Sequence, residues 1–372
     1  MIESRKKINL NDLILNSALT AINIQNDNGS FPPGKNGPWN NKDTPLRVTA
    51  HYGILLLEAY RRTNESKFKS NAKRGYDYVI RKNNRPFNFS FKCRESDDPA
   101  INGNGLIGQA WIIESLIKAY EVLNDELYLD IVEDVISKHK FNYEYNLWHT
   151  LGIDGKILDI HTTFNQQLWF SLMAYKFTQL RNSKEILNSS SKFFKNLDSL
   201  IKFDKFIRML IRSKNLDIKK ISRNYIKSIA AKTLLKDHFR KISEGYLSFT
   251  LLGIAKLFDL DQNLKIWNNN NFKKKLRSSM LYLDEKLYYE DQNKYAFQYN
   301  PIGFEAAIIQ EKFSEYLNMQ YKHSIEDWIQ KQLYNHYNFE KYLMNRNTVD
   351  PQTLAARIYE ITDIEQNEIV FN

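Results

Sequence analysis

Three carboxylic acids lie at positions where they could act as general acids or bases. Asp98 precedes a glycine-containing turn into an apolar segment, Asp43 precedes another apolar segment, and Glu305 lies within a third. Burial beside such segments raises the pKa of a carboxyl, as general acid catalysis near neutral pH requires. Asp98 is therefore the candidate acid/base, with Asp43 or Glu305 as its partner. Two alternatives stay open: Asp98 belongs to a solvated loop, and Glu305 is the buried partner of Arg357.

Basic side chains near the same segments suggest a second kind of chemistry. Arg47 and His51 lie one helical turn apart at the start of an apolar segment, and His161 precedes another. A guanidinium can hold a substrate carboxylate through two hydrogen bonds, and an imidazole can transfer protons near neutral pH. The alternative is that Arg47 and His51 form a buried, hydrogen-bonded pair.

Aromatic and amide side chains gather in the polar stretches that lead into these apolar segments. Aromatic faces stack on the CH faces of sugars, and amides both donate and accept hydrogen bonds with hydroxyls. The candidate sugar-binding residues, besides Arg47, are Trp39, Asn102, Gln109, Trp111, Asn165, Gln167, Trp169, Tyr299 and Asn300. Asn165, Gln167 and Trp169 cannot all share one helix face, so only some of them reach a ligand. Helix capping and turn formation are the alternative roles of these stretches.

Two kinds of helix must position these residues. Six nearly all-round apolar helices are predicted to begin near Leu46, Leu106, Thr163, Glu244, Pro301 and Asp350. Six amphipathic helices alternate with them, near Asn9–Ile24, Glu65–Lys82, Asp125–Lys138, Ser183–Ile201, Phe272–Leu283 and His323–Asn335. A helix that is apolar all round is buried on both sides, whereas an amphipathic helix keeps one face exposed to solvent.

The alternation predicts an all-α fold, an (α/α)6 toroid of six helical hairpins, in one domain over residues 1–372. The apolar helices form the inner ring and the amphipathic helices the outer ring. All loops that enter inner helices then emerge at one end, which gathers the polar stretches in a single cleft. An open solenoid of helix pairs is the alternative, but its repeats should resemble one another more closely.

The net charge of +10 is concentrated in one stretch. Between Lys202 and Lys241 there are 13 lysines and arginines against three aspartates, interleaved with apolar residues. We expect a basic helical insertion at about residues 202–242, which could dock on a membrane surface, an acidic glycan or a partner such as a glycosyltransferase. A solvated insertion is the plainer interpretation. Nucleic-acid binding is not expected, because the charge is confined to one insertion and no known module matches.

Several motifs are absent from the sequence. It contains no glycine-rich nucleotide-binding motif, no HExxH zinc pattern and no apolar stretch long enough to span a membrane. Cys93 is the single cysteine, so no disulfide can form within the chain, and we interpret Cys93 as structural. No signal peptide is recognisable at the N-terminus. We therefore expect a cytoplasmic protein without a metal ion or other cofactor.

The polar stretches and the starts of the apolar helices resemble the six-hairpin glycosidase-like superfamily. Within it they resemble the AglQ-like proteins of glycosylation and surface-polysaccharide gene clusters. The resemblance covers most of the chain except the basic insertion. The segments that carry it are FPPGKNGPW, TPLRVTAHYG, NGNGLIGQAW, TFNQQLWF, EGYLSF, YNPIGFEAA and DPQTLAARIYE. It implies a saccharide ligand, often one with hexuronic acid. Relatives include unsaturated glucuronyl hydrolases with an Asp acid/base, and sugar 2-epimerases with paired histidines. Lanthionine cyclases share the toroid, but their zinc-binding cysteines are lacking here.

The leading hypothesis is hydrolysis of a uronic-acid-containing saccharide, with Asp98 as acid/base and Arg47 holding the carboxylate. A hexuronate epimerase that uses His51 and His161 is the second, and a non-catalytic glycan-binding or assembly factor is the third. The geometry of the cleft separates them. Two carboxylates about 5 to 10 Å apart across the cleft favour a glycosidase. Carboxylates that are all held in ion pairs with Arg47 and Arg357 favour binding.

Overall fold

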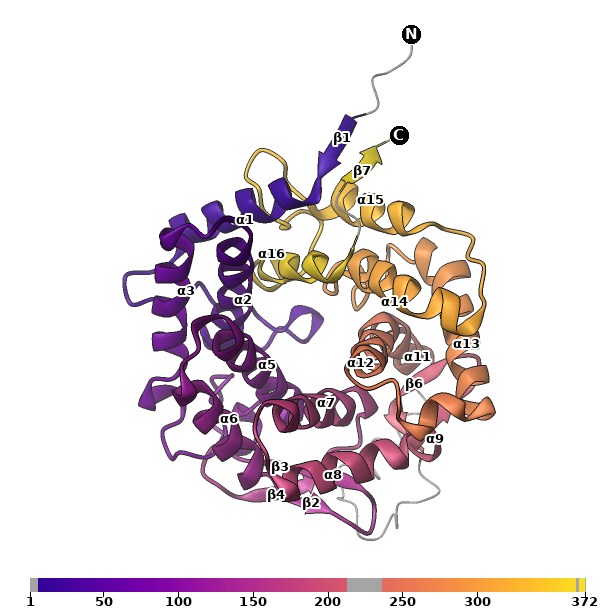
Figure 1. Ribbon diagram of the computed structural model, residues 1–372, viewed down its shortest axis with the longest axis horizontal. Helices are drawn as coiled ribbons and strands as arrows, with labels where there is room; N and C mark the ends of the chain where they lie inside the picture. Colours follow the sequence, from indigo (N-terminus) through magenta and orange to yellow (C-terminus); the bar gives the residue numbers. More distant parts are fainter. Residues whose placement is uncertain (1–5, 213–235, 366–367, 372) are drawn as a thin grey trace.

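The molecule is a closed ring of helices in two concentric layers (Figure 1). The computed structural model describes residues 6–212, 236–365 and 368–371. The inner layer consists of α2 (Leu46–Thr63), α5 (Gly105–Leu123), α7 (Phe164–Leu180), α12 (Leu247–Leu260), α14 (Ile302–Leu317) and α16 (Pro351–Ala356), which continues as the 3-10 segment η6 (Arg357–Asp363). These elements begin within a few residues of the six predicted starts. The all-α toroid is confirmed.

The outer layer covers the inner one with helices that have one exposed face. It consists of α1 (Leu10–Ile24), α3 (Ser66–Val79), α6 (Glu126–Lys138), α8 (Lys184–Lys195), α13 (Asn270–Glu285) and α15 (Ile325–His336). Several of these helices start on side-chain caps. The Asn9 and Asn269 side chains accept from backbone N–H groups of α1 and α13, and Ser324 and Asp327 form a capping box on α15. Such caps satisfy the first N–H groups of a helix.

Contacts between neighbours follow the chain order around the ring. Inner helices meet in the order α2, α5, α7, α12 and α14, and η6 contacts both α14 and α2. The last inner element therefore closes on the first, which rules out the open solenoid. The termini reinforce the closure, because β1 (Lys6–Asn9) pairs antiparallel with β7 (Glu368–Phe371). In Figure 1 these two strands lie side by side at the edge of the ring.

The inner helices are buried over nearly their whole surface. In α2, every residue from Leu46 to Ala59 is buried. Three inner helices, α2, α5 and α14, end on an asparagine with a positive φ: Asn64, Asn124 and Asn318. Asparagine tolerates this left-handed conformation, which terminates a helix and frees the chain to turn back outward.

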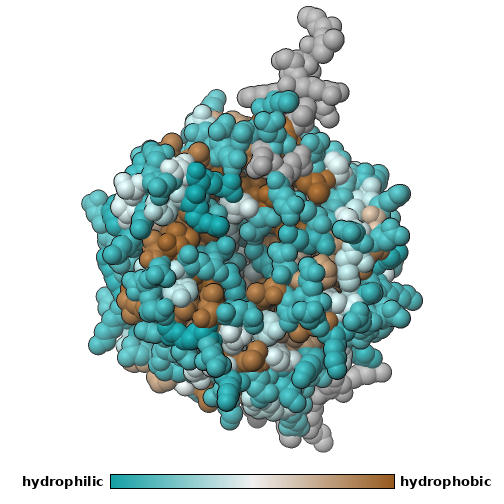
Figure 2. All heavy atoms as spheres, in the orientation of Figure 1, coloured by the Kyte–Doolittle hydropathy of each residue, from teal (hydrophilic) through white to brown (hydrophobic). Residues whose placement is uncertain are grey.

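Short elements fill the connections. Before α7, β2 (Phe141–Asn142), β3 (Leu147–Leu151) and β4 (Ile157–Ile160) form an antiparallel sheet. The other short helices are η1 (Gly37–Trp39), η2 (Lys82–Asn84), α4 (Pro99–Asn102), α9 (Leu197–Leu200), η4 (Lys265–Asn268) and η5 (Leu287–Tyr289). None of the helices in the described ranges is long and apolar enough to cross a bilayer. In Figure 2 the visible face is mostly hydrophilic, with hydrophobic side chains scattered over it.

The predicted basic helical insertion differs from the structure in its first part. Residues 201–211 form an antiparallel hairpin of β5 (Ile201–Phe203) and β6 (Ile207–Ile211), so the helical prediction is wrong there. Ile207 and Ile211 are buried at the two ends of β6, where this strand packs on α7 and α12 of the ring. Helix α11 (Lys236–Gly245) follows, and residues 213–235 lie outside the described part of the chain, together with most of the expected docking surface.

Candidate functional site

A cleft with two lobes lies at the end of the barrel where the inner helices begin. The inner lobe has a volume of about 380 Å³ and the outer lobe about 800 Å³. The lobes share Arg94, Asn104, Thr163, Gln166 and Met209. Since helix N-termini carry partial positive charge, several of them converging on one cleft favour an anionic ligand. The expected gathering of polar loops at one end is present here.

Aromatic rings form the walls and floor of the inner lobe. Its lining includes Trp39, Trp111, Tyr246, Phe249 and Tyr299. Trp39 is 42% exposed and donates from Nε1 to the Tyr246 hydroxyl at 2.9 Å, so its ring is held at the mouth. Trp111 is only 8% exposed and forms part of the floor. Flat rings at two depths suit the CH faces of a sugar.

Two polar groups in the inner lobe lack a hydrogen-bond partner among the described residues. They are Arg94 Nε and the Oδ1 atom of Asn165, and both atoms are buried. Arg94 Nε forms an ion pair with Asp43 Oδ1 at 4.0 Å, beyond hydrogen-bond distance, and this Asp43 oxygen likewise has no hydrogen bond in the described part of the chain. The inner lobe therefore presents a weakly paired cationic donor and an amide acceptor without a hydrogen bond, which suit a ligand with both functions. No carboxylate stands among the described residues that line this lobe.

The outer lobe contains the carboxylate that the sequence singled out. Asp98 lines it, as do Asp159 and His161. Asp98 caps α4 by accepting from the backbone N–H of Ala100 at 2.9 Å, and it is exposed rather than buried as expected. The residues around His161 desolvate its ring and lower its pKa to about 4, so the imidazole is neutral at physiological pH.

Gly105 lets the chain pass close to His161. It has a φ of +61°, and a Cβ atom here would lie 2.4 Å from Gln166 Oε1 and 3.3 Å from the His161 ring. A larger residue would therefore be strained and would also intrude between the two side chains. The start of α5 and the start of α7 meet at this point of the cleft.

Arg47 is buried behind the inner lobe, and both of its terminal amino groups are hydrogen-bonded, whereas its Nε has no partner among the described residues. Its guanidinium donates to Asp43 at 2.5 Å, to the Tyr299 hydroxyl at 3.0 Å and to Thr353 at 2.9 Å. Asp350 also lies 3.5 Å away. Burial favours the neutral carboxyl of Asp350, but Arg47 and backbone N–H groups outweigh it and hold its pKa below the usual value. Arg47 therefore joins the first and last inner elements of the ring.

Asp43 is held in this cluster by Arg47. Burial raises the pKa of its carboxyl despite the opposing fields of Arg47 and Arg94. A carboxylate so close to a buried guanidinium is poorly placed to exchange protons with a substrate. Both terminal amino groups of Arg47 are likewise occupied, and Arg47 lines neither lobe, so it is poorly placed to hold a substrate carboxylate.

Glu305 is the ion-pair partner of Arg357, which was the open alternative. Arg357 donates to Glu305 at 2.6 Å, to Glu360 at 2.6 Å and to Asn300 at 2.8 Å. Glu305 also accepts from Ser248 at 2.5 Å and is completely buried. Burial raises the pKa of Glu305, and it raises the pKa of Glu360 to about 8. One guanidinium thus serves two buried carboxyls.

His51 lies beneath the cleft rather than in its lining. Its ring centroid lies 5.7 Å from those of both Trp111 and Tyr359. Neither ring nitrogen has a hydrogen-bond partner in the described residues, so the hydrogen-bonded pair with Arg47, which was the open alternative, is not formed. Burial, with the fields of Arg357 and Arg47, holds the pKa of His51 far below its usual value.

Four predicted amide ligands bond to the protein itself and do not line either lobe. Gln109 bridges the backbone of Phe91, and Gln167 bridges the backbone of Trp148. Asn102 donates to the Ser96 carbonyl, and Asn300 donates to backbone carbonyls and accepts from Arg357. These amides fix the loops that shape the cleft.

Trp169 also lies outside the cleft lining, and it supports the floor. Its ring stacks on Phe249 with centroids 4.7 Å apart, and its Nε1 donates to the Phe249 carbonyl at 3.1 Å. Three residues of the segment TFNQQLW were predicted to bind the ligand, and Asn165 is the one of them that lines the cleft. Gln166 reaches it as well and was not predicted.

Other cleft residues were missed as well. Arg94, Asn36, Asn41, Asn104, Tyr246 and Phe249 all lie in or next to stretches that the sequence marked as polar loops or inner-helix starts. Arg94 stands in FKCRESDD, where the neighbouring acids drew attention instead. The described residues contain no group of three or more His, Cys, Asp or Glu side chains that could hold a metal ion.

One curated relative is similar along the whole chain. Archaeal glycosylation protein Q from Haloferax volcanii is 31% identical over 379 aligned positions, covering 97% of this chain and 98% of its own length. The chain belongs to this family. No family model matches the sequence.

Solved structures share the fold at low sequence identity. Cellobiose 2-epimerase from Bacillus thermoamylovorans B4167 superposes with a TM-score of 0.63 at 10% identity, covering 95% of this chain and 98% of its own. The α-1,6-mannanase of Salegentibacter sp. HEL1_6 gives 0.56 at 13% identity, covering 95% and 98%. An unsaturated glucuronyl hydrolase specific for heparin gives 0.54 at 12% identity, covering 95% and 96%. These likenesses establish the six-hairpin toroid.

Proposed function

We propose that this protein binds an acidic saccharide in the cleft and hydrolyses a glycosidic bond within it, as a step in glycan assembly or processing. The observation that carries the proposal is the inner lobe, where Arg94 Nε and Asn165 Oδ1 lie among aromatic rings and neither has a hydrogen bond in the described residues. A cationic donor and an acceptor without hydrogen bonds match a ligand with a carboxylate and hydroxyls. Its glycosylation-protein relative is consistent with a saccharide ligand.

In this proposal Arg94 takes the role that the sequence assigned to Arg47. Arg94 is only partly buried, with a side chain 19% exposed, and it lines both lobes. A uronate carboxylate beside it accepts a charge-assisted hydrogen bond, while Asn165 accepts from a sugar hydroxyl. Trp39 and Trp111 stack on the sugar faces.

Asp98 is the general acid/base of the proposed reaction. Asp43 and Glu305 are held by Arg47 and Arg357, whereas Asp98 is exposed in the outer lobe and keeps only a backbone N–H as partner. In the proposed reaction the carboxyl group of Asp98 donates a proton to the leaving oxygen of a saccharide that occupies the outer lobe. Asp159 is a second carboxylate of this lobe.

A second candidate is recognition without turnover. It is favoured by the ion pairs of Asp43, Asp350 and Glu305 with the two buried arginines. An epimerase with paired histidines receives less support, because His161 lines the cleft whereas His51 lies beneath Trp111 and outside the lining. In each case the cleft binds the saccharide in the same way.

The test is a turnover screen with oligosaccharides that contain saturated or 4,5-unsaturated uronic acids, analysed by mass spectrometry and NMR. We expect a cleaved product from the wild type and at least about a hundredfold loss in Asp98→Asn, the usual scale for removing a general acid. Asp97→Asn is the matched control, since Asp97 is an exposed neighbour outside the cleft lining. Full turnover by Asp98→Asn refutes the assignment. Binding without any product supports recognition alone, and solvent deuterium in an uncleaved sugar supports epimerisation.

A further inference from the structure

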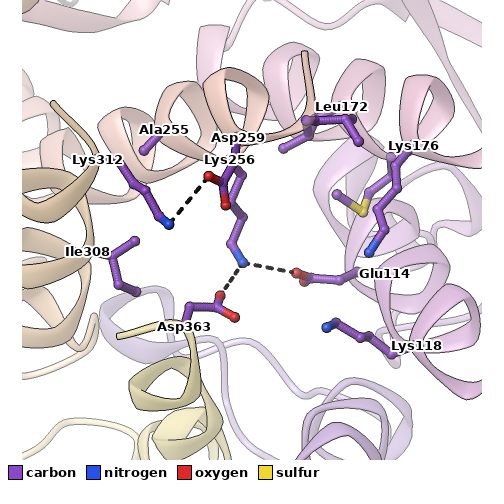
Figure 3. Close-up of a pocket in the computed structure, with 12 residues that line it drawn as sticks. Glu114, Lys118, Leu172, Lys176, Ala255, Lys256, Asp259, Ile308, Lys312 and Asp363 are labelled. Carbon is purple, nitrogen blue, oxygen red and sulfur yellow. Dashed lines mark hydrogen bonds and ion pairs between the residues drawn. The ribbon is translucent and has the colours of Figure 1, made fainter. Parts of the chain in front are cut away.

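A second cavity lies at the opposite end of the barrel, where the inner helices end (Figure 3). We call it the axial pocket. Its volume is about 290 Å³, and residues of α5, α7, α12, α14 and η6 line it. Cleft residues of the inner elements come from their loops and first two turns, whereas this lining comes from their middle and last turns. The two cavities are therefore separate sites.

Each of four inner helices places one lysine in this lining. The four are Lys118, Lys176, Lys256 and Lys312. They lie four or five residues before the last residues of their helices, which are Leu123, Leu180, Leu260 and Leu317. The repeat brings four ammonium groups to one cavity between the helices, where their side chains stay partly exposed. The field of a helix C-terminus attracts cations, which accounts for part of this repeat.

Three of these lysines have close ion-pair partners. Lys256 donates to Asp363 at 2.5 Å, Lys176 lies 2.9 Å from Glu121, and Lys312 lies 3.3 Å from Asp259. Glu121 stands outside the lining, so the remaining N–H groups of Lys176 stay available to the pocket. Burial alone would lower the pKa of Lys256, but Asp363 and Glu114 raise it overall. Lys256 and Asp363 are therefore charged and hold the sixth inner element against α12.

Two facing groups are left without a hydrogen bond among the described residues. Lys118 Nζ lies 3.8 Å from both Glu58 and Glu121, and Glu114 lies 4.0 Å from Lys256. The Glu114 side chain is 8% exposed. In Figure 3, Glu114, Lys118 and Lys176 point into the same space. Glu114 is thus nearly buried with Lys256 as a distant ion-pair partner and no hydrogen bond from the described residues, and helix-end electrostatics does not account for a carboxylate at this place.

The chemistry of the lining specifies a ligand with two functions. Lys118 and Lys176 supply donors and positive charge for an anionic group, and Glu114 supplies an acceptor for a hydroxyl. Leu172, Met173 and Ile308 give an apolar wall for CH groups. We propose that the axial pocket binds a small hydroxylated phosphate, of the sugar phosphate class, with its phosphate at Lys118 and Lys176 and a hydroxyl at Glu114. The site is distinct from the saccharide cleft and does not depend on the function proposed for the cleft.

The test is isothermal titration of the full-length protein with glucose 1-phosphate, inorganic phosphate and glucose. We expect glucose 1-phosphate to bind most tightly and glucose not to bind detectably. Lys118→Met should weaken glucose 1-phosphate by about tenfold or more, the scale of one charge-assisted hydrogen bond. Glu114→Gln should change the affinity for glucose 1-phosphate but not for inorganic phosphate. Lys73→Met, an exposed lysine of α3, is the matched control and should have no effect.

Three results overturn the proposal. They are no binding of glucose 1-phosphate, unchanged binding in both Lys118→Met and Glu114→Gln, and loss of binding in the cleft variant Arg94→Gln instead. The thermal unfolding midpoint of each variant is measured beside its titration. If Lys118→Met does not fold, Lys176→Gln carries the same test, since Lys176 is 24% exposed and faces the same space.

Discussion

Replacing Arg357 with methionine should destabilise the ring strongly and in a pH-dependent way. Arg357 makes three buried hydrogen bonds, to Glu305, Glu360 and Asn300 at 2.6, 2.6 and 2.8 Å. Methionine keeps much of the volume and removes all three donors. Glu305, which is completely buried, then has no counterion.

The expected cost follows from the burial of this pair. Removing one partner of a buried ion pair costs about 3–5 kcal/mol, because the other charge stays unpaired or must bind a proton. Protonation of one carboxyl becomes easier by about 1.4 kcal/mol for each unit that the pH falls. The destabilisation by Arg357→Met should therefore shrink as the pH is lowered from about 7 toward the ordinary range of a glutamic acid. Glu305→Gln in the same chain should restore part of the stability at neutral pH.

Urea unfolding followed by circular dichroism measures these differences. Arg61→Met is the matched control, because Arg61 is 57% exposed and its buried partner Glu58 keeps a second ion-pair partner, Lys118 at 3.8 Å. An ion pair with a solvent-exposed guanidinium contributes about 0–1 kcal/mol, so Arg61→Met should cost little. An Arg357→Met variant as stable as Arg61→Met, or one whose destabilisation does not change with pH, would refute the reasoning about the buried charge.

Three further predictions concern buried titratable groups. Burial raises the pKa of Glu360 to about 8. Its contribution to the free energy of unfolding is therefore complete below the ordinary glutamate pKa and is lost as the pH rises through about 8. Glu360→Gln should remove this pH dependence in urea unfolding experiments. Burial raises the pKa of Cys93 to about 12, so a thiol reagent should modify Cys93 only after unfolding. Burial lowers the pKa of His161 to about 4, so its NMR ring signals should stay unchanged between about pH 8 and pH 5.5. A titration midpoint of these signals near pH 6.5 would contradict this prediction.

The architecture could be predicted from sequence because inner and outer helices bury different fractions of their surface. An all-round apolar segment such as α5 and an amphipathic one such as α6 differ in pattern regardless of the ring that they form. The hairpin at 201–211 was missed because its basic residues are interleaved with apolar ones in a way that suits either structure.

The cleft was harder to predict, because sequence position does not tell whether a polar side chain faces a ligand or its own loop. Gln167 and Asn165 are two residues apart, yet one bonds to the backbone of Trp148 and the other reaches the cleft. Arg94 was missed because its position depends on the path of a loop without regular structure. Glu305 and Arg357 were easier, since both lie on inner elements and a buried charge needs a partner.

The central claim is that Arg94 makes the cleft selective for an acidic saccharide. The direct measurement is a calorimetric titration with a uronic-acid oligosaccharide and with its neutral counterpart, in the wild type and in Arg94→Gln. The wild type should prefer the acidic saccharide by at least about tenfold, the scale of one charge-assisted hydrogen bond. Arg94→Gln should lose that preference and keep its affinity for the neutral sugar. An undiminished preference in Arg94→Gln, or no binding of either saccharide by the wild type, would contradict the account.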